Sequence, residues 1–213
     1  MKILVYVEGP SDKLSLETVL KPLLEQKRQQ GISITFHEAP AGDKKVSVLN
    51  KVPVKAVNIL CNEPDSIVVA IPDLYPKNHG LPHSSADELC DGMKQIFAQA
   101  VERRGCDTRV GERFFAFCFI HDLEALLLAV PDLLRQRIGA KNLKQSWAVP
   151  VEEQNNQQPP KYVVQRLFDE AGKKYKDTVD SPLILANANY LELAEACPQG
   201  FGKFVRFLEE QNV

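Results

Sequence analysis

The sequence predicts an α/β fold with a mostly parallel four-stranded sheet flanked by helices, followed by a helical C-terminal region. Short apolar, β-rich runs alternate with segments of helical periodicity, and this alternation is typical of parallel strands joined by right-handed crossovers. Two of the runs are apolar almost throughout, as expected of strands that are buried on both faces. Beyond about residue 130 only helical patterns follow.

The individual elements follow from these patterns. Four runs are expected to form strands: Ile3–Val7, Ile32–Phe36, Ser66–Pro72 and Arg113–Ile120. Apolar spacing predicts helices from Ser11 or Asp12 to Gly31 with a kink at Pro22, over 44–62 with a break at Pro53, and over 86–104, 121–129, 161–172, 183–196 and 201–210. The polar stretch 149–160 is typical of a linker or a long surface loop. We therefore expect an α/β body over residues 1–130 and a helical region over 131–213, packed on it as one compact unit.

Composition limits the classes of function. The chain has 213 residues, 44% of them hydrophobic, which is enough for one sizeable domain or a domain with a subdomain. A net charge of −2 and a pI near 6.1 argue against a protein that coats nucleic acid through its overall charge. An acidic segment, 61–133, precedes a basic one, 134–176. This order suits a carboxylate metal site beside a phosphate-binding segment, or it is ordinary variation between solvated faces.

The cysteines and the N-terminus point to the cytoplasm. The five cysteines are odd in number and lack any Cys-x-x-Cys spacing, which predicts reduced thiols. The start, MKILVYVEG, is too short for a signal peptide, and no run approaches the ~20 apolar residues of a membrane span. No glycine-rich phosphate loop is present, so the chain is not expected to hydrolyse ATP by itself.

Three acidic residues lie at or just beyond the ends of predicted strands. Glu8 follows the first strand, Asp73 the third and Glu124 the fourth. The carboxyl ends of parallel strands meet at one edge of the sheet, where open α/β folds bind ligands. Three converging acids repel one another unless a cation is bound, and Mg²⁺ or Mn²⁺ prefers such oxygen ligands. The pattern predicts a divalent-metal site from the joint placement of the three acids, although each acid taken alone is more often a helix cap or turn former.

The segment VEGPSDK, Val7 to Lys13, resembles the opening motif of toprim domains, especially those of OLD-type nucleases. That motif places a glutamate and a glycine at the end of the first strand. The resemblance implies that Glu8 is a metal-linked or acid/base residue and that Gly9 lies beside the substrate. The later toprim motif, Asp-x-Asp, corresponds here to IPDLYP, where Asp73 matches the first position and Tyr75 occupies the second. One possible ligand of a two-metal site is therefore absent.

Three further segments, HDLEALLLA, PPKYVVQRL and CPQGFGKFVRFL, resemble a toprim-related family of unassigned function, whose members often lie beside ATPase genes of the OLD or chromosome-maintenance type. A His-x-x-Glu-Ala motif of that family falls on His121, Glu124 and Ala125. His121 and Glu124 are three residues apart and would share one face of a helix, as two ligands or as a base and its orienter. The alternative is a histidine packed against the strand end.

The same resemblance suggests phosphate contacts for Lys161 and Arg166, with a solvated helix face as the alternative. Together these features predict a Mg²⁺- or Mn²⁺-dependent nuclease or phosphodiester-processing enzyme. Its metal ligands would be Glu8, Asp73 and Glu124, with assistance from His121. The expected partners are nucleic acid, DNA rather than RNA, and a separate ATPase. An oligomer is possible, and no membrane partner is expected. The resemblance implies a role in defence against foreign DNA.

Two other functions remain open at this point. The first is a non-catalytic toprim-like subunit that binds and regulates an ATPase complex, which Tyr75 in place of a second aspartate favours. The second is a small-molecule phosphohydrolase using the same acids, which a closed pocket in place of an open groove would favour.

Overall fold

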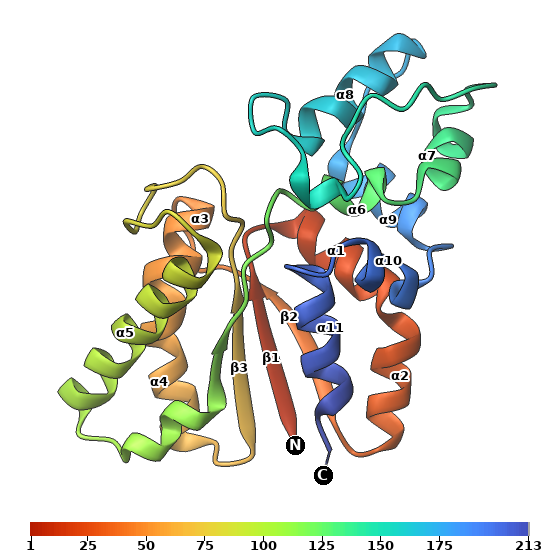
Figure 1. Ribbon diagram of the computed structural model, residues 1–213. Coiled ribbons are helices and arrows are strands. Elements are labelled where there is room, and N and C mark those ends of the chain that lie inside the picture. The colour runs from red at the N-terminus through yellow and green to blue at the C-terminus, as the bar shows by residue number, and fades with distance from the viewer. Residues whose placement is uncertain (213) are drawn as a thin grey trace. The chain divides into compact units, whose positions relative to one another are not determined.

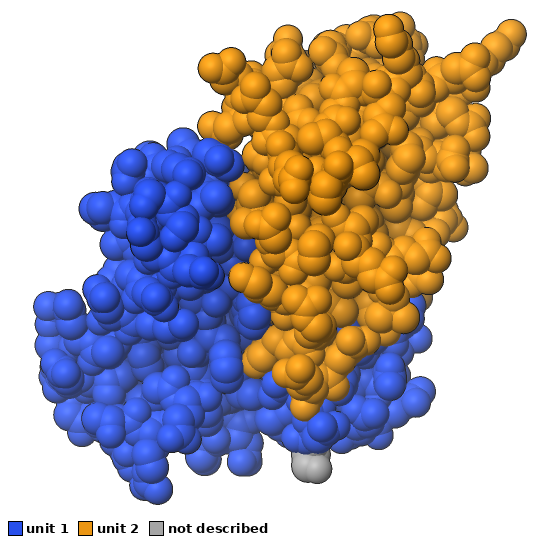
Figure 2. Space-filling model, in the orientation of Figure 1, with its two compact units in different colours: residues 1–9, 22–118, 211–213 blue, residues 10–21, 119–210 orange. Residues whose placement is uncertain are grey.

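The computed structural model describes residues 1–212 and divides the chain into two compact units, coloured separately in Figure 2. The first unit contains residues 1–9, 22–118 and the C-terminal residues from 211. The second contains residues 10–21 and 119–210. The division predicted from the sequence lies near residue 130. The compact units instead divide after residue 118, and the segment that follows the first strand belongs to the second unit.

The first unit is built on a four-stranded, fully parallel sheet with the strand order β2-β1-β3-β4, which confirms the predicted α/β class for the described residues (Figure 1). The strands are β1 (Lys2–Val7), β2 (Ser33–Glu38), β3 (Ser66–Ile71) and β4 (Phe114–Ala116). All six residues of β3 are buried. Side chains of β3 are therefore buried on both faces of the sheet, which explains why its sequence is apolar from Ile67 onward.

Strand β4 is much shorter than the predicted run from 113 to 120. Its last ladder hydrogen bond joins the Phe117 N–H to the Ala70 carbonyl at 3.0 Å, and the chain then leaves the sheet. At the other end, the Arg113 guanidinium donates to the carbonyls of Leu60, Glu63 and Ser66 at 2.7, 2.9 and 3.0 Å. Arg113 therefore holds the start of β4 against the end of the helix over residues 52–62 and the start of β3, and does not belong to the strand.

Helices cover both faces of this sheet. They are α2 (Lys21–Gln29), α3 (Lys44–Val46), a π-helical turn (Ser47–Lys51), α4 (Val52–Asn62), α5 (Ala86–Arg104) and a 3-10 turn (Thr108–Arg113). Helices α4 and α5 lie side by side on one face and α2 lies on the other (Figure 1). This follows from right-handed crossovers, because the chain steps from β1 to β2 in one direction and returns past β1 to β3 in the other. The predicted break at Pro53 appears as the wide π turn that precedes α4.

A disulfide joins Cys61, in the last turn of α4, to Cys106, just after α5, so the expectation that all five thiols are reduced is wrong. The sequence showed no Cys-x-x-Cys motif because the two residues are 45 positions apart and meet only through the packing of α4 on α5. Cys90, Cys118 and Cys197 are free thiols.

We expect Cys61→Ser with Cys106→Ser to lower the free energy of unfolding by about 3–4 kcal/mol, since a cross-link closing a loop of this size restricts the unfolded chain by about that amount. Urea unfolding of the oxidised protein and of the double variant measures the difference. Cys90→Ser, which removes a free thiol, is the control. A double variant as stable as the control would contradict the prediction.

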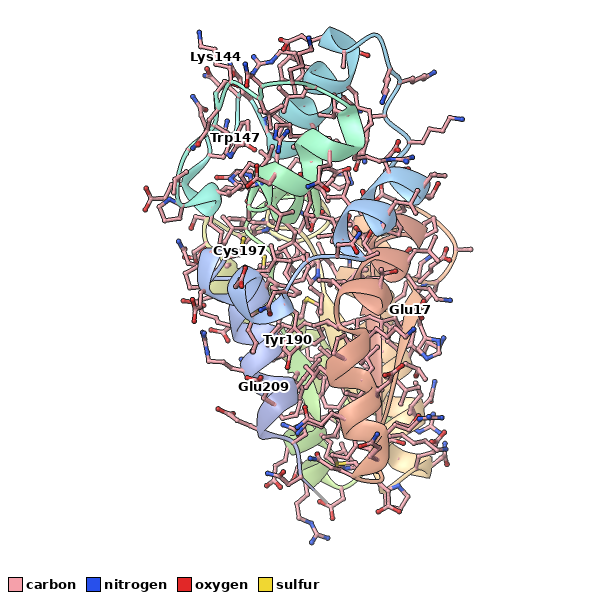
Figure 3. The ribbon with its side chains drawn as sticks, turned by 90° about the vertical axis from the view of Figure 1, so that its right-hand side faces the viewer. Glu17, Lys144, Trp147, Tyr190, Cys197 and Glu209 are labelled. Atoms are coloured by element: carbon pink, nitrogen blue, oxygen red, sulfur yellow. A yellow bond between two sulfur atoms is a disulfide. The ribbon has the colours of Figure 1, made fainter. Side chains whose placement is uncertain are left out.

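The second unit is helical. Its elements are α1 (Pro10–Val19), α6 (Glu124–Leu128), α7 (Pro131–Ile138), a 3-10 turn (Val151–Glu153), α8 (Pro160–Glu170), α9 (Asp177–Leu185), α10 (Tyr190–Ala196) and α11 (Phe201–Glu210). Helix α1 packs along α9. The buried Trp147, labelled in Figure 3, donates its indole N–H to the Leu128 carbonyl at 3.1 Å and so fastens the long loop before α8 onto α6.

Two predicted helices are each divided in two. Helices α1 and α2 are separated at Leu20, because Pro22 lacks an N–H and its ring clashes with the carbonyl four residues earlier. The predicted helix over 183–196 is also interrupted: the Asn189 side chain accepts the Leu191 N–H at 3.0 Å and starts α10 anew. Over residues 1–212, no helix is long and apolar enough to cross a membrane.

Candidate functional site

Glu8 and Asp73 lie together at the carboxyl edge of the sheet. Val7, the last residue of β1, is in register with Ile71, the last residue of β3, so the residues that follow the two strands are neighbours. The Asp73 N–H donates to Glu8 Oε1 at 3.0 Å. Both side chains are half-buried, and Gly9 beside Glu8 is buried. The parallel register therefore brings together two acids that are 65 residues apart in the sequence.

A buried lysine that the sequence analysis missed lies beside these two acids. Lys45 belongs to the short helix α3 and is only 4% exposed. Its Nζ donates to the carbonyls of Leu74 and Pro76 at 2.9 and 2.7 Å. Burial lowers the pKa of Lys45, while the nearby charges of Glu8 and Asp73 act in the opposite direction. The first unit thus places an ammonium group next to two carboxylates.

The loop after Asp73 is held in place by polar contacts within the first unit. The Leu74 carbonyl, which accepts from Lys45, also lies 3.0 Å from Nε2 of the buried His83. The His83 N–H donates to the Asn78 side chain at 2.9 Å. On the lysine side, Asp43 caps α3 by accepting the Val46 N–H at 3.0 Å. Both segments that carry the site are therefore fixed by their own hydrogen bonds.

Glu124 lies in the second unit, where it begins α6 and is 3% exposed. The Lys161 ammonium is 3.4 Å from Glu124 Oε1, and the Tyr175 hydroxyl donates to the same oxygen at 3.0 Å. Lys161 also forms an ion pair with Asp177 at 3.1 Å. Burial and the charge of Glu124 raise the pKa of the Tyr175 hydroxyl. Within its unit, Glu124 is thus a buried carboxylate bound by a cation and a hydroxyl.

Asp122 belongs to the same buried cluster. Its carboxylate accepts the Lys161 N–H at the start of α8, at 3.1 Å to one oxygen and 3.3 Å to the other. Asp122 therefore binds the first turn of a helix 39 residues further along the chain. Burial, together with the charge of Glu124, raises the pKa of Asp122 to about 8.

His121 does not share a helix face with Glu124, because α6 begins only at Glu124 and His121 lies in the turn before it. The spacing argument for this pair is therefore wrong. His121 is buried and borders a small cavity with Cys197 and Phe201. Burial lowers the pKa of its ring, while hydrogen bonds with the backbone of Gln154 and Glu152 oppose that change. Its assisting role stays a prediction.

The two predicted phosphate contacts both have acidic or polar partners within the second unit. Lys161 is bound by Glu124 and Asp177, as described above. Arg166, on α8, donates to the Ser146 hydroxyl at 2.6 Å and lies 3.8 Å from Glu170. Among residues 1–212, neither unit gathers three or more His, Cys, Asp or Glu side chains in an arrangement that could hold a metal ion. The structure therefore brings together Glu8 and Asp73, while Glu124 has its own surroundings in the other unit.

We expect Lys161→Met to lower the free energy of unfolding by about 1–3 kcal/mol, because it leaves the buried Glu124 without its cation while keeping the apolar stem. This decrease in the free energy of unfolding lies at the lower end of the range for a broken buried ion pair, because the side chain of Lys161 is 40% exposed. Calorimetric unfolding measures the change. Lys144→Met, which removes an exposed lysine in the same unit, is the control. Equal stability of the two variants would show that the Glu124 pair contributes nothing.

The chain is similar to a protein family and to a solved structure. Among curated proteins no sequence matches the chain. Among solved structures, the C-terminal region of the Burkholderia pseudomallei OLD protein matches with a TM-score of 0.48 and 16% sequence identity, over 98% of this chain and 96% of that one. The family model described as Domain of unknown function (DUF4276) matches residues 7–209, from the end of β1 to the last turn of α11. The chain belongs to this DUF4276 family.

Proposed function

We propose that this chain is a metal-dependent nuclease or a related phosphodiester-processing enzyme of toprim type. One observation carries the proposal: the ends of two adjacent parallel strands place Glu8 against Asp73, with the buried Lys45 beside both. Paired carboxylates bind divalent cations and a lysine ammonium binds phosphate. A phosphodiester with its metal ion requires both kinds of group in one place.

The residues fit one divalent ion. Mg²⁺ is usually held by one or two carboxylates, and waters and substrate phosphate oxygens complete its coordination. A carboxylate accepts at two oxygens, so the hydrogen bond from the Asp73 N–H to Glu8 Oε1 is compatible with metal binding. Two metals fit less well, because Tyr75 occupies the position of a second aspartate. A bound ion of this kind polarises a phosphoryl oxygen and lowers the pKa of its water.

The chain's own residues supply the rest of the chemistry. Glu8 holds the metal or exchanges a proton with the attacking or leaving oxygen. Lys45, oriented by the carbonyls of Leu74 and Pro76, stabilises the negative charge that develops on the phosphate. Lys45 needs no reorganisation for this role, because its position is fixed before substrate binds. Gly9, without a side chain, leaves room for the substrate next to Glu8.

The remaining functional residues are part of the same proposal. Glu124 is the third metal ligand, with His121 assisting, and Lys161 and Arg166 contact the nucleic-acid backbone. The proposal for Glu124 requires its carboxylate to exchange Lys161 for the metal. Glu124→Gln tests this: a weaker uptake of Mn²⁺ supports it, and an unchanged uptake leaves Glu8 and Asp73 as the ligands.

The proposed substrate is DNA rather than RNA, the cofactor is Mg²⁺ or Mn²⁺, and the enzyme acts in the cytoplasm with a separate ATPase in defence against foreign DNA. The defence role rests on the resemblance of VEGPSDK to the opening motif of OLD-type nucleases, and the ATPase partner on the resemblance of HDLEALLLA, PPKYVVQRL and CPQGFGKFVRFL to a family whose members often lie beside ATPase genes. The test is incubation of the full chain with single- and double-stranded DNA and RNA in Mg²⁺, in Mn²⁺ and in EDTA. We expect cleavage with metal alone. Absence of cleavage of every substrate in both metals would contradict the enzymatic proposal.

A non-catalytic subunit that binds and regulates an ATPase complex is the second candidate, and two observations favour it. Tyr75 replaces a possible ligand, and the Lys45 ammonium already provides a positive charge beside the two carboxylates. Such a subunit would take up no Mn²⁺ in a way that depends on Glu8, so calorimetric titration with Mn²⁺ separates the two functions.

A further inference from the structure

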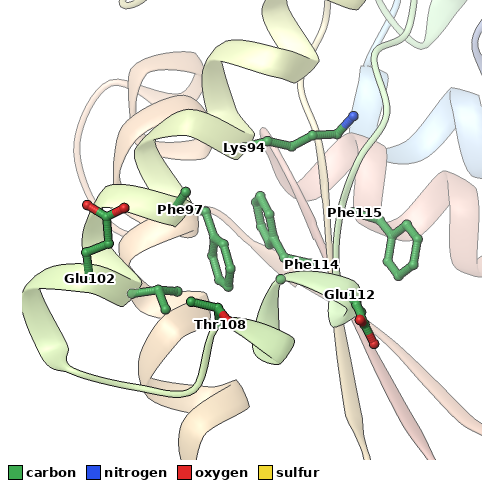
Figure 4. A pocket seen from close by; sticks show the side chains of 10 residues that line it. Lys94, Phe97, Glu102, Thr108, Glu112, Phe114 and Phe115 are labelled. Carbon is green, nitrogen blue, oxygen red and sulfur yellow. The ribbon is translucent and has the colours of Figure 1, made fainter.

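The surface between α5 and β4 contains a pocket of about 400 Å³, shown in Figure 4. One wall is a single face of α5, where residues spaced by three and four positions follow one another: Lys94, Phe97, Ala98, Val101 and Glu102. The opposite wall comes from β4 and the turn before it. The rings of Phe97 and Phe114 stack across the floor with centroids 4.5 Å apart. The pocket is therefore apolar in its middle.

The pocket runs beside an edge of the sheet. Strand β4 has β3 as its neighbour on one side and no strand of the described residues on the other. Backbone groups alternate in direction along a strand. Because the Phe117 N–H points to Ala70, the N–H and C=O of Ala116 point away from β3. An edge strand of this kind is a template for pairing with another strand.

The two ends of the pocket carry opposite charges. Lys94 and Glu112 lie at opposite ends, and Glu102 lies to the left, away from Glu112 (Figure 4). Lys94 and Glu102 are separated by eight residues of α5, which corresponds to about 12 Å along a helix. Glu112 lies just before β4 and is exposed, as are Lys94 and Glu102. A partner that lies along the pocket must therefore present charges in the reverse order.

We propose that this surface is an interface between two copies of the chain, paired antiparallel about a twofold axis along their β4 edges. In such an isologous contact the same patch faces itself. The antiparallel direction then places Lys94 of each copy against Glu112 of the other, twice per dimer. Phe97, Val101 and Phe114, which line the middle of the pocket, are already buried within each copy, so the contact is made by the β4 edge and the charged side chains. Lys94 already forms an exposed ion pair with Asp91 of its own helix at 3.2 Å, and Glu112 of the second copy adds a further carboxylate beside it.

The test is the mass of the full chain in solution, measured by sedimentation equilibrium over a concentration series. We expect a reversible dimer. Lys94→Glu and Glu112→Lys should each weaken it by at least about tenfold, since every change creates two like-charge contacts per dimer. The double variant K94E/E112K restores the opposite charges across the axis and should regain most of the lost affinity. Arg103→Glu reverses a charge on the same helix outside the pocket and should leave the dimer unchanged.

Three results would overturn the proposal. They are a monomer at every concentration, a double variant that is no better than either single variant, and an equal effect of Arg103→Glu and Lys94→Glu. Circular dichroism of each variant confirms that it is folded, and the rescue in the double variant cannot arise from misfolding. The outcome is independent of metal binding or cleavage, because none of these residues belongs to the proposed catalytic site.

Discussion

We expect Glu8→Gln to reduce metal-dependent phosphodiester cleavage by about 10³-fold or more, because loss of a charged metal ligand removes several kcal/mol of transition-state stabilisation. The substitution is nearly isosteric. A glutamine oxygen still accepts the Asp73 N–H, so the hydrogen bond that joins β1 to β3 at this edge is kept. The loss of activity therefore reports on the charge of Glu8 and not on the fold. Initial cleavage rates at saturating Mn²⁺ measure it.

The matched control for this variant is Glu38→Gln. Glu38 is the last residue of β2, in register with Val7, and is exposed at the same edge of the sheet. The Glu38→Gln substitution changes the net charge by the same amount as Glu8→Gln. We expect the cleavage rate of this control variant to remain within about threefold of that of the unchanged protein. If both variants lose activity equally, the effect is a general one of edge charge. If Glu8→Gln cleaves at the original rate, Glu8 has no role in the chemistry.

We expect Lys45→Met to lower the free energy of unfolding by about 3–5 kcal/mol, the usual result of breaking a buried ionic contact. Methionine keeps much of the apolar stem. It removes the ammonium donor from the carbonyls of Leu74 and Pro76 and from the neighbourhood of the Glu8 and Asp73 charges. Since a divalent ion replaces that positive charge, Mn²⁺ should stabilise this variant more than the unchanged protein. Calorimetric unfolding with and without Mn²⁺ gives both quantities.

Lys27→Met is the control for this second prediction. Lys27 is also a buried lysine of the first unit, and it donates to the carbonyl of Gln211 at 2.7 Å near the opposite end of the sheet. The Lys27→Met variant should be less stable than the unchanged protein, and Mn²⁺ should stabilise it no more than it stabilises the unchanged protein. Equal stabilisation of the two variants by Mn²⁺ would mean that the metal does not bind beside Lys45.

The placement of Glu8 and Asp73 could be predicted because it depends only on strand order and parallel direction. Both acids follow strongly apolar strands whose ends the sequence locates to within a residue or two. The position of Lys45 could not be predicted in the same way. Its burial depends on the loop around Leu74 and Pro76 folding over it, and nothing in the KKV segment indicates that contact. A search of the segment after β2 for a cation near the same sheet edge would have found it.

Glu124 shows the opposite case. The sequence placed it just past a strand because RFFAFCFI is apolar throughout, yet β4 stops at Ala116 and the chain enters the second unit after Cys118. Apolar runs indicate burial, and burial in a sheet cannot be distinguished from burial in a connecting segment by composition alone. Lys161 and Tyr175, which bind Glu124, come from segments whose packing the sequence pattern does not specify.

Calorimetric titration of the full chain with Mn²⁺ tests the central claim most directly. We predict uptake of one ion per chain, an affinity at least about tenfold lower in Glu8→Gln and in Asp73→Asn, and an unchanged affinity in Glu38→Gln. Uptake that is absent, or that is the same in all three variants, would contradict a metal site at the ends of β1 and β3.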